Sequence, residues 1–150
     1  MDGPWREWRV DGKLRVAADY SLGHLHGTYK ETTDGGLRIV GEYRNGVRHG
    51  TWTTFDEAGG LMNRGRYRKG KRHGSWRTTL EGGQHLVGRY VEGDRRGTFT
   101  LFSQAGVRLA SGPFAGDKRT GKWTEYDDDG NVTASGTLLD GVRYGAWVHF

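Results

Sequence analysis

Two stretches of this chain, 24 residues apart, decide how it folds. Residues 41–52 are GEYRNGVRHGTW and residues 65–76 are GRYRKGKRHGSW, so Gly, aromatic, Arg and His positions recur in one order. The closing triplet, Gly-x-aromatic, occurs once every 23 or 24 residues along the chain. The triplets begin at Gly3, Gly27, Gly50, Gly74, Gly97, Gly121 and Gly145. A fixed period of this length is typical of repeat proteins, so the repeat is expected to be the structural unit.

The aromatic residues fall into columns of this repeat. The triplet column contains Trp5, Tyr29, Trp52, Trp76, Phe99, Trp123 and Trp147. A second column contains Tyr20, Tyr43, Tyr67, Tyr90 and Phe114, and a third contains Trp8, Phe55, Phe102, Tyr126 and Phe150. Tyr144 alone stands outside these columns. Because aliphatic residues are few, the triplet column and the residues from Tyr43 to Phe114 of the second column are expected to form a structural aromatic ladder.

Each repeat is predicted to be a β-hairpin. Residues 51–55 are β-branched and aromatic, residues 56–60 are turn-forming, and residues 61–67 alternate as a second strand. We group the dipeptides that favour tight turns into one class: Asp11-Gly12, Asn45-Gly46, Lys69-Gly70, Glu92-Gly93, Asp129-Gly130 and Asp140-Gly141. The predicted fold is all-β, an elongated single antiparallel sheet of about six tandem hairpins. Residues 1–150 form one array, with repeats at approximately 3–26, 27–49, 50–73, 74–96, 97–120 and 121–144 and a half-repeat at 145–150.

A second glycine column supports this fold. It lies two residues before the second aromatic column and contains Gly41, Gly65, Gly88, Gly112 and Gly136, with Ala18 in the first copy. A glycine inside a strand weakens it unless something packs closely on the backbone. We therefore expect a neighbouring aromatic ring to lie on each of these glycines.

Composition excludes several classes of function. The chain has no Cys, so it carries neither disulfides nor a thiol nucleophile. No Ser lies in a nucleophile-elbow sequence, and the Gly-rich stretches are turns that lead into no helix. The six His suggest no closed ligand set, so neither a metal nor another cofactor is expected. The net charge of +5 is compatible with nucleic acid, but no recognition motif accompanies it.

Residues 41–52 and 65–76 resemble the MORN (membrane occupation and recognition nexus) repeat. Ile39, Asn63, Leu86, Ala110 and Ala134 stand where the common eukaryotic motif has Tyr, and a single Gly precedes Thr51-Trp52. The chain is more similar to the bacterial MORN variant of YwqK-type antitoxin-like proteins. The resemblance implies an elongated hairpin array with a binding function and no enzymatic activity, located in the cytoplasm, where attachment to a membrane surface stays open.

One polar column is the candidate binding site. It contains Arg48, Arg72, Arg95, Arg119 and Arg143, each two residues before the triplet Gly, with His49 and His73 beside it. We call the five arginines the basic ladder. Such a row could bind an acidic protein, lipid headgroups or phosphates. The alternative is that each arginine packs over a ring and serves the fold.

The sequence therefore predicts a non-enzymatic module for protein–protein interaction, with an antitoxin-like or scaffolding role. Its partner would be another protein, acidic or a toxin, whereas nucleic acid is not expected. Two alternatives stay open: a peripheral binder of anionic lipid, and an accessory array of a larger enzyme. Exposed edge strands at the ends of the sheet add strand addition or self-association as a further alternative. Whether the chain is a piece of a longer protein stays open.

Overall fold

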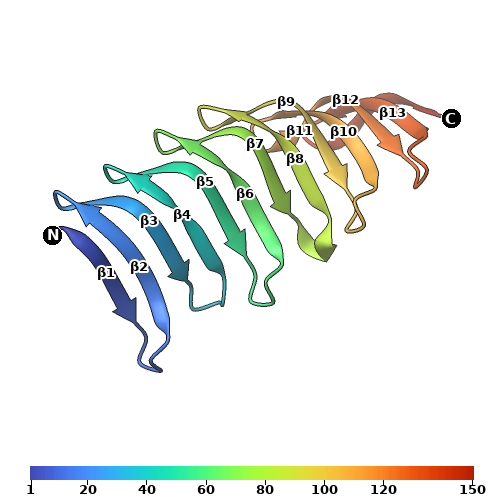
Figure 1. Ribbon diagram of the computed structural model, residues 1–150. Helices are drawn as coiled ribbons and strands as arrows, with labels where there is room; N and C mark the ends of the chain where they lie inside the picture. Colours follow the sequence, from blue (N-terminus) through green and yellow to red (C-terminus); the bar gives the residue numbers. More distant parts are fainter. The chain divides into compact units, whose positions relative to one another are not determined.

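The structure is a computed structural model that describes residues 1–150, and it consists of strands joined by short turns (Figure 1). The strands are β1 (Gly3–Trp8), β2 (Leu14–Ser21), β3 (His24–Thr32), β4 (Arg38–Arg44), β5 (Val47–Phe55), β6 (Leu61–Arg68), β7 (Lys71–Thr79), β8 (His85–Val91), β9 (Asp94–Phe102), β10 (Arg108–Ala115), β11 (Lys118–Arg119), β12 (Gly121–Tyr126), β13 (Val132–Leu139) and β14 (Val142–His149). One 3-10 turn, Glu81–Gly83, follows β7. No helix has the length and apolar character needed to cross a membrane.

The sheet is antiparallel and its strand order follows the chain order, with β11 pairing β10 off the main path. The expected all-β fold of successive hairpins is thereby confirmed. The chain divides into two compact units, unit 1 (Met1–His73) and unit 2 (Gly74–Phe150). Each unit repeats the same two kinds of strand. A first strand carries the triplet (β1, β3, β5, β7, β9, β12 and β14), and a second strand follows it (β2, β4, β6, β8, β10 and β13).

Two classes of turn join these strands, where the sequence interpretation had one. In five of the six turns from a second strand to the next first strand, both central residues have positive φ, for example Asn45 (50°) and Gly46 (77°); in the turn after β10 only Gly116 does. This conformation suits a two-residue hairpin because its twist matches that of the strands. From a first strand to its second strand the loop is longer, and grouping Asp11-Gly12 and Asp129-Gly130 with Asn45-Gly46 was wrong.

Asp127 shows how the longer loop is built. Its backbone N donates to the carbonyl of Asn131 at 3.0 Å, while its carboxylate accepts from the backbone N of Asp129 and of Asn131 at 3.0 and 2.8 Å. Only the glycine of this loop, Gly130, has positive φ (85°). An aspartate that accepts local backbone N–H groups in this way stabilises a turn that needs no left-handed residue other than glycine.

Every triplet glycine has positive φ, and Gly50 shows how such a glycine forms a β-bulge in its first strand. Gly50 has a φ of 65°, and the register of β5 against β4 shifts around it, from Glu42 opposite His49 to Val40 opposite Thr53. The bulged strand thus has two more residues than its partner over this interval. Glycine adopts the left-handed conformation without the steric cost of a Cβ, which explains why the repeat needs glycine here.

The bulge directs the triplet ring back over the preceding second strand, where it is buried. Trp52 is 4% exposed and Trp123 is 1% exposed. A Cβ built on Gly41 would lie 2.2 Å from Cδ2 of Trp52, and one on Gly112 would lie 2.5 Å from Cδ2 of Trp123. The expectation that rings lie on the glycines of the second strands is confirmed for Gly41, Gly88, Gly112 and Gly136.

The indole N–H compensates for hydrogen bonds that the bulge removes from the ladder. Nε1 of Trp52 donates to the carbonyls of Glu42 (3.1 Å) and His49 (3.2 Å), the pair at which the register shifts. Nε1 of Trp123 donates in the same way to Pro113 (3.0 Å) and to a carbonyl three residues before it (3.1 Å). A buried carbonyl without a donor is costly, so Trp contributes a hydrogen bond as well as apolar area.

Candidate interaction surface

The basic ladder lies on the same face as the triplet rings, and its guanidinium groups stack on them. Cζ of Arg48 lies 4.4 Å from a ring centroid of Trp52, and the corresponding distances are 4.8 Å for Arg119 over Trp123 and 4.1 Å for Arg143 over Trp147. These distances are within the range of cation–π attraction. Arg72, in β7, is half-buried. The ladder arginines therefore contribute to the packed frame whether or not they bind a partner.

Arg48 is also held by tyrosine hydroxyls. Its Nη1 donates to the hydroxyl of Tyr67 at 3.2 Å. Burial lowers the pKa of Arg48, but hydrogen bonds to the hydroxyls of Tyr43 and Tyr67 outweigh it, so the pKa is raised above its ordinary value. Arg48 is consequently a fixed positive charge.

Arg95 and Arg143 have carboxylate partners. Nε of Arg95 donates to the hydroxyl of Tyr90 at 2.9 Å, and its Nη2 lies 3.7 Å from a carboxylate oxygen of Asp117. The Arg95 side chain is only 19% exposed. Nη2 of Arg143 donates to both carboxylate oxygens of Glu125 at 3.1 and 3.0 Å. The charge of the ladder is thus partly compensated within the fold.

Two of the three ladder arginines of unit 2 border hollows on the surface. Arg95 and Arg119 line one of about 440 Å³ together with the apolar side chains of Leu80, Leu86 and Phe114. Arg95 also lines a second hollow, of about 500 Å³, in which Arg96 and Tyr90 take part. Asp117 lines both. Guanidinium groups beside apolar walls are suited to bind another protein's side chains, because such contacts combine apolar burial with charge recognition.

The two histidines of the candidate site, His49 and His73, lie half-buried beside the ladder. The carbonyl of His49 is one acceptor of the Trp52 indole N–H, so its backbone serves the bulge. Within residues 1–150, no group of three or more His, Cys, Asp or Glu side chains is placed to hold a metal ion. The structure places ladder arginines against aromatic rings. It does not place His49 and His73 in a cluster of three or more side chains that could hold a metal ion.

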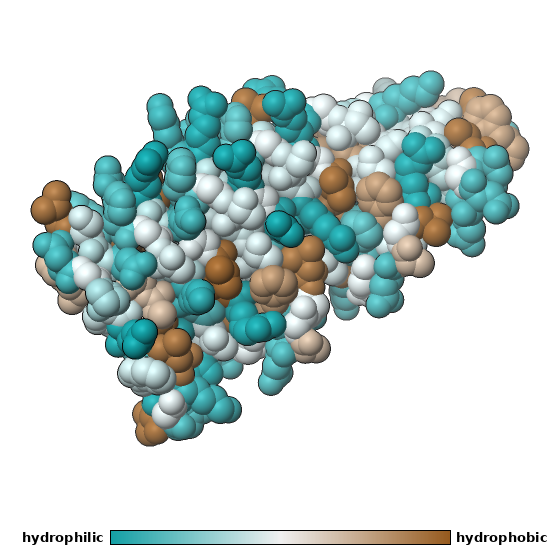
Figure 2. Space-filling view, viewed as in Figure 1, coloured by the Kyte–Doolittle hydropathy of each residue, from teal (hydrophilic) through white to brown (hydrophobic).

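Sequence reasoning missed a second set of arginines, on the opposite face of the strands. Arg64 lies opposite Thr53, Arg89 lies opposite Ser75, and Arg77 lies opposite Val87, each on the face away from the triplet rings. All three arginines are exposed. The alternation rule could have found them, since each is adjacent in sequence to a glycine or tryptophan of the ring face. Figure 2 shows that hydrophilic side chains dominate the visible surface, with hydrophobic ones scattered among them.

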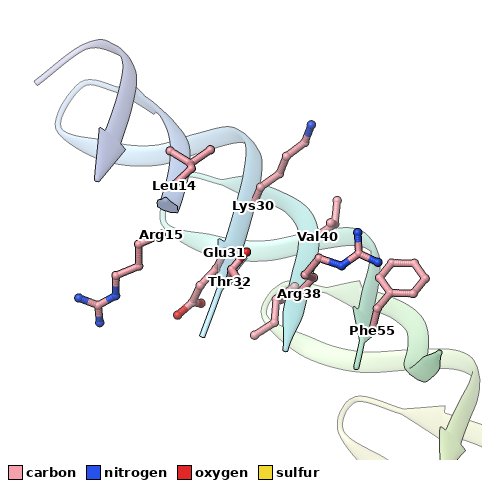
Figure 3. Close-up of a pocket in the computed structure, with 9 residues that line it drawn as sticks. Leu14, Arg15, Lys30, Glu31, Thr32, Arg38, Val40 and Phe55 are labelled. Atoms are coloured by element: carbon pink, nitrogen blue, oxygen red, sulfur yellow. The ribbon is translucent and has the colours of Figure 1, made fainter. Parts of the chain in front are cut away.

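Unit 1 carries a hollow of its own, of about 350 Å³ (Figure 3). Val40 and Phe55 contribute apolar wall, and Lys30 and Arg38 contribute charge. Arg38 extends over Phe55, with its Cζ 5.4 Å from the ring centroid, whereas Arg15 points away. The combination of cation and ring thus recurs outside the basic ladder, and the sequence analysis did not single it out.

Comparison with known proteins identifies two repeats. The family described as MORN repeat variant matches residues 48–69 and 119–138. Each match spans most or all of a first strand, the loop and most or all of the following second strand, which is one hairpin of the structure. No curated protein matches the chain. MORN repeats are in general non-catalytic modules that interact with proteins or membranes, so the resemblance seen in the sequence is supported for these two segments.

Proposed function

We propose that this chain is a non-enzymatic module that binds another protein through the ring face, where the basic ladder borders apolar hollows. The observation that carries the proposal is the hollow in unit 2, in which Arg95 and Arg119 stand beside Leu80, Leu86 and Phe114. A protein surface with a carboxylate next to an apolar side chain fits this combination. Lipid headgroups would match the charges but would leave the apolar wall uncovered.

The finer role that we propose is antitoxin-like or scaffolding, in the cytoplasm. Its support is the resemblance of residues 41–52 and 65–76 to the bacterial MORN variant, together with an arginine position that recurs from repeat to repeat. A recurrent arginine position suits a partner that makes equivalent contacts with successive repeats of one unit. An acidic partner fits the net charge of +5.

The test compares two double variants within unit 2 that remove the same charge. Arg95→Gln with Arg119→Gln changes the ring face, and Arg77→Gln with Arg89→Gln changes the exposed arginines of the opposite face. The tagged chain is used to capture partners from its own cell, and a captured partner is purified for direct binding. We expect the ring-face pair to lose binding and the opposite-face pair to keep it. Equal binding by both variants would remove the basic ladder from the proposal.

Binding to anionic lipid is the second candidate, and the exposed Arg77 and Arg89 of unit 2 favour it. Arginines that project into solvent from one face attract an anionic surface, and salt weakens this attraction. Sedimentation with phosphatidylserine-containing vesicles at low and high salt tests it. Retention at low salt that Arg77→Gln with Arg89→Gln abolishes would support a lipid surface, and no retention at low salt would reject it.

A further inference from the structure

The third aromatic column of the sequence has no part in the proposed function. Its rings end their first strands, with Trp8 in β1, Phe55 in β5, Phe102 in β9 and Tyr126 in β12. Each ring comes three residues after a triplet ring, so strand alternation places it on the face away from the triplet rings. β3 and β7 end differently, because Thr32 and Thr79 stand where these strands have a ring.

Unit 2 shows what such a ring provides for its neighbours. Arg108 lies opposite Phe102, and its Cζ lies 3.8 Å from the ring centroid of Tyr126, so this guanidinium group has a ring on each neighbouring first strand. Arg38 has the equivalent place in unit 1, because it lies opposite Thr32 in β3 and opposite the column ring of β5. Its Cζ is 5.4 Å from the centroid of the β5 ring, but Thr32 offers it no ring on the other side.

A hollow lies where this ring is missing. The hollow of unit 1, of about 350 Å³, is lined in part by Thr32 and Arg38 (Figure 3). Leu14 and Val40 form apolar walls, and each is 37% exposed. Clefts of this size with mostly apolar walls and a few polar groups are typical of sites for small organic molecules. The fold therefore offers a place for one ring, with apolar walls and a guanidinium group beside it.

The charge at this hollow is positive and not balanced by a carboxylate. Lys30 and Arg38 are exposed, and the ion pairs of unit 1 join other residues. Arg15 also lines the hollow, but its Nη1 lies 2.8 Å from a carboxylate oxygen of Glu7. The carboxylate of Glu31 accepts a hydrogen bond from a tyrosine hydroxyl at 2.9 Å, and Figure 3 shows its side chain projecting away from Lys30. An anionic group of a ligand would therefore complement Lys30 and Arg38.

We propose that this hollow binds a small aromatic carboxylate, in which a two-carbon linker joins a planar ring to the acid group. The ring takes the place of the missing column ring at Thr32, between Leu14 and Arg38, where cation–π attraction to the guanidinium group adds to apolar burial. The carboxylate accepts hydrogen bonds from Nζ of Lys30, which lies two residues before Thr32 on the same face, about 7 Å along the strand. The proposal is independent of the partner that the ring face of unit 2 binds.

The probe is 3-phenylpropionate, added to the full chain while its methyl and amide NMR signals are followed. We expect the methyl signals of Leu14 and Val40 and the amide signal of Thr32 to shift with one dissociation constant of about 1 mM or lower. Two analogues should bind about tenfold more weakly: 3-phenylpropanamide, which has the ring without the charge, and hexanoate, which has the charge without the ring. No shift at about 5 mM probe, or equal binding by either analogue, overturns the proposal.

Two variants that remove one positive charge from the same face of unit 1 form a matched pair. Lys30→Gln changes the lining of the hollow, and Arg64→Gln changes an exposed arginine outside it, three strands further along the same row of paired residues. Lys30→Gln should weaken 3-phenylpropionate about tenfold and leave 3-phenylpropanamide unchanged, whereas Arg64→Gln should alter neither. An equal loss in both variants would mean a general attraction of anions to a basic surface, and would overturn the proposal.

Thr32→Phe tests the place of the ring, because it supplies the side chain that β1, β5, β9 and β12 have in this column. We expect it to abolish binding of 3-phenylpropionate while the far-UV circular dichroism stays that of the parent chain. Undiminished binding by the folded variant overturns the proposal. If Thr32→Phe does not fold, the Lys30→Gln and Arg64→Gln comparison decides, since both of these side chains are exposed.

The source of the carboxylate is tested with a peptide. A hexapeptide that ends in Phe carries a substituted 3-phenylpropionate at its C-terminus, and N-acetylphenylalanine is the matching small molecule. We expect the two to bind alike, because the hollow has room for little more than the terminal residue. A hexapeptide that binds more than about tenfold more tightly would overturn the small molecule in favour of the C-terminus of a protein.

Discussion

Gly112→Ala is the sharpest test of how the rings are held. The added Cβ would lie 2.5 Å from Cδ2 of Trp123, whereas carbon atoms in contact are about 3.5–4.0 Å apart. The ring must therefore move by about 1 Å or more. Trp123 is 1% exposed, and its Nε1 lies 3.0 and 3.1 Å from the two carbonyl oxygens to which it donates. The movement therefore strains packed neighbours and breaks these hydrogen bonds.

The expected cost follows from these two effects. Overpacking of a filled site costs about 1–3 kcal/mol. The loss of the indole hydrogen bonds adds about 1 kcal/mol. We expect Gly112→Ala to lower the free energy of unfolding by about 2–4 kcal/mol, measured by urea denaturation with tryptophan fluorescence and circular dichroism.

Gly35→Ala is the matched control. Gly35 does not have positive φ, and the nearest atom to its added Cβ is Oγ1 of Thr33 at 4.0 Å. Its change in stability should stay within about 1 kcal/mol of zero. Trp123→Ala supplies a second control, because Gly112→Ala should cost little once the ring is gone. Equal effects of Gly112→Ala and Gly35→Ala, or additivity of Gly112→Ala with Trp123→Ala, would refute the reasoning.

Three further predictions concern single residues. Trp123→Phe keeps a ring on Gly112 but removes the N–H, and should cost about 1–3 kcal/mol in urea denaturation; no loss would mean that the indole bonds are dispensable. Leu22→Asn should stabilise the chain by about 0.5–1 kcal/mol in the same assay, since Leu22 is exposed at a φ of 50°, which Asn tolerates better; destabilisation would contradict this. Burial, and secondarily Arg77, lower the pKa of His85, whose Nδ1 makes no hydrogen bond and whose ring stacks on Phe102. The fold therefore favours neutral His85, and its contribution to stability should fall as the pH drops below about 6.5, the unfolded pKa. His85→Phe should flatten the stability–pH curve below about pH 6.5, and an unchanged slope there would contradict the prediction that the fold favours neutral His85.

The period and identity of the repeated residues were sufficient to predict hairpins, antiparallel pairing and rings on glycine. Gly41 and Gly112 behave as their column suggests, because a strand glycine is stable only where something packs on it. The turn class was mistaken at Asp11 and Asp129, since Asp-Gly suits both a two-residue hairpin and a longer loop, and only the pairing of the flanking strands distinguishes them.

The candidate site was harder to predict than the fold. The column of Arg48 and Arg95 is visible in the sequence. Whether a guanidinium group faces solvent or a ring depends on where the bulge at the triplet glycine places the neighbouring ring, and no local sequence pattern specifies that position. Arg95 shows the outcome: it reaches the Phe114 ring (4.4 Å) and Asp117 while still lining two hollows. The exposed arginines of the opposite face were overlooked because they fall outside the aromatic columns.

On the proposed function, the ring-face arginines both hold the frame and contact the partner. The most direct measurement is an NMR titration that follows the side-chain Nε–Hε signals of arginine while the captured partner is added. The signals of Arg95 and Arg119 should shift with a common dissociation constant while those of Arg77 and Arg89 stay in place. Shifts confined to Arg77 and Arg89 would contradict it.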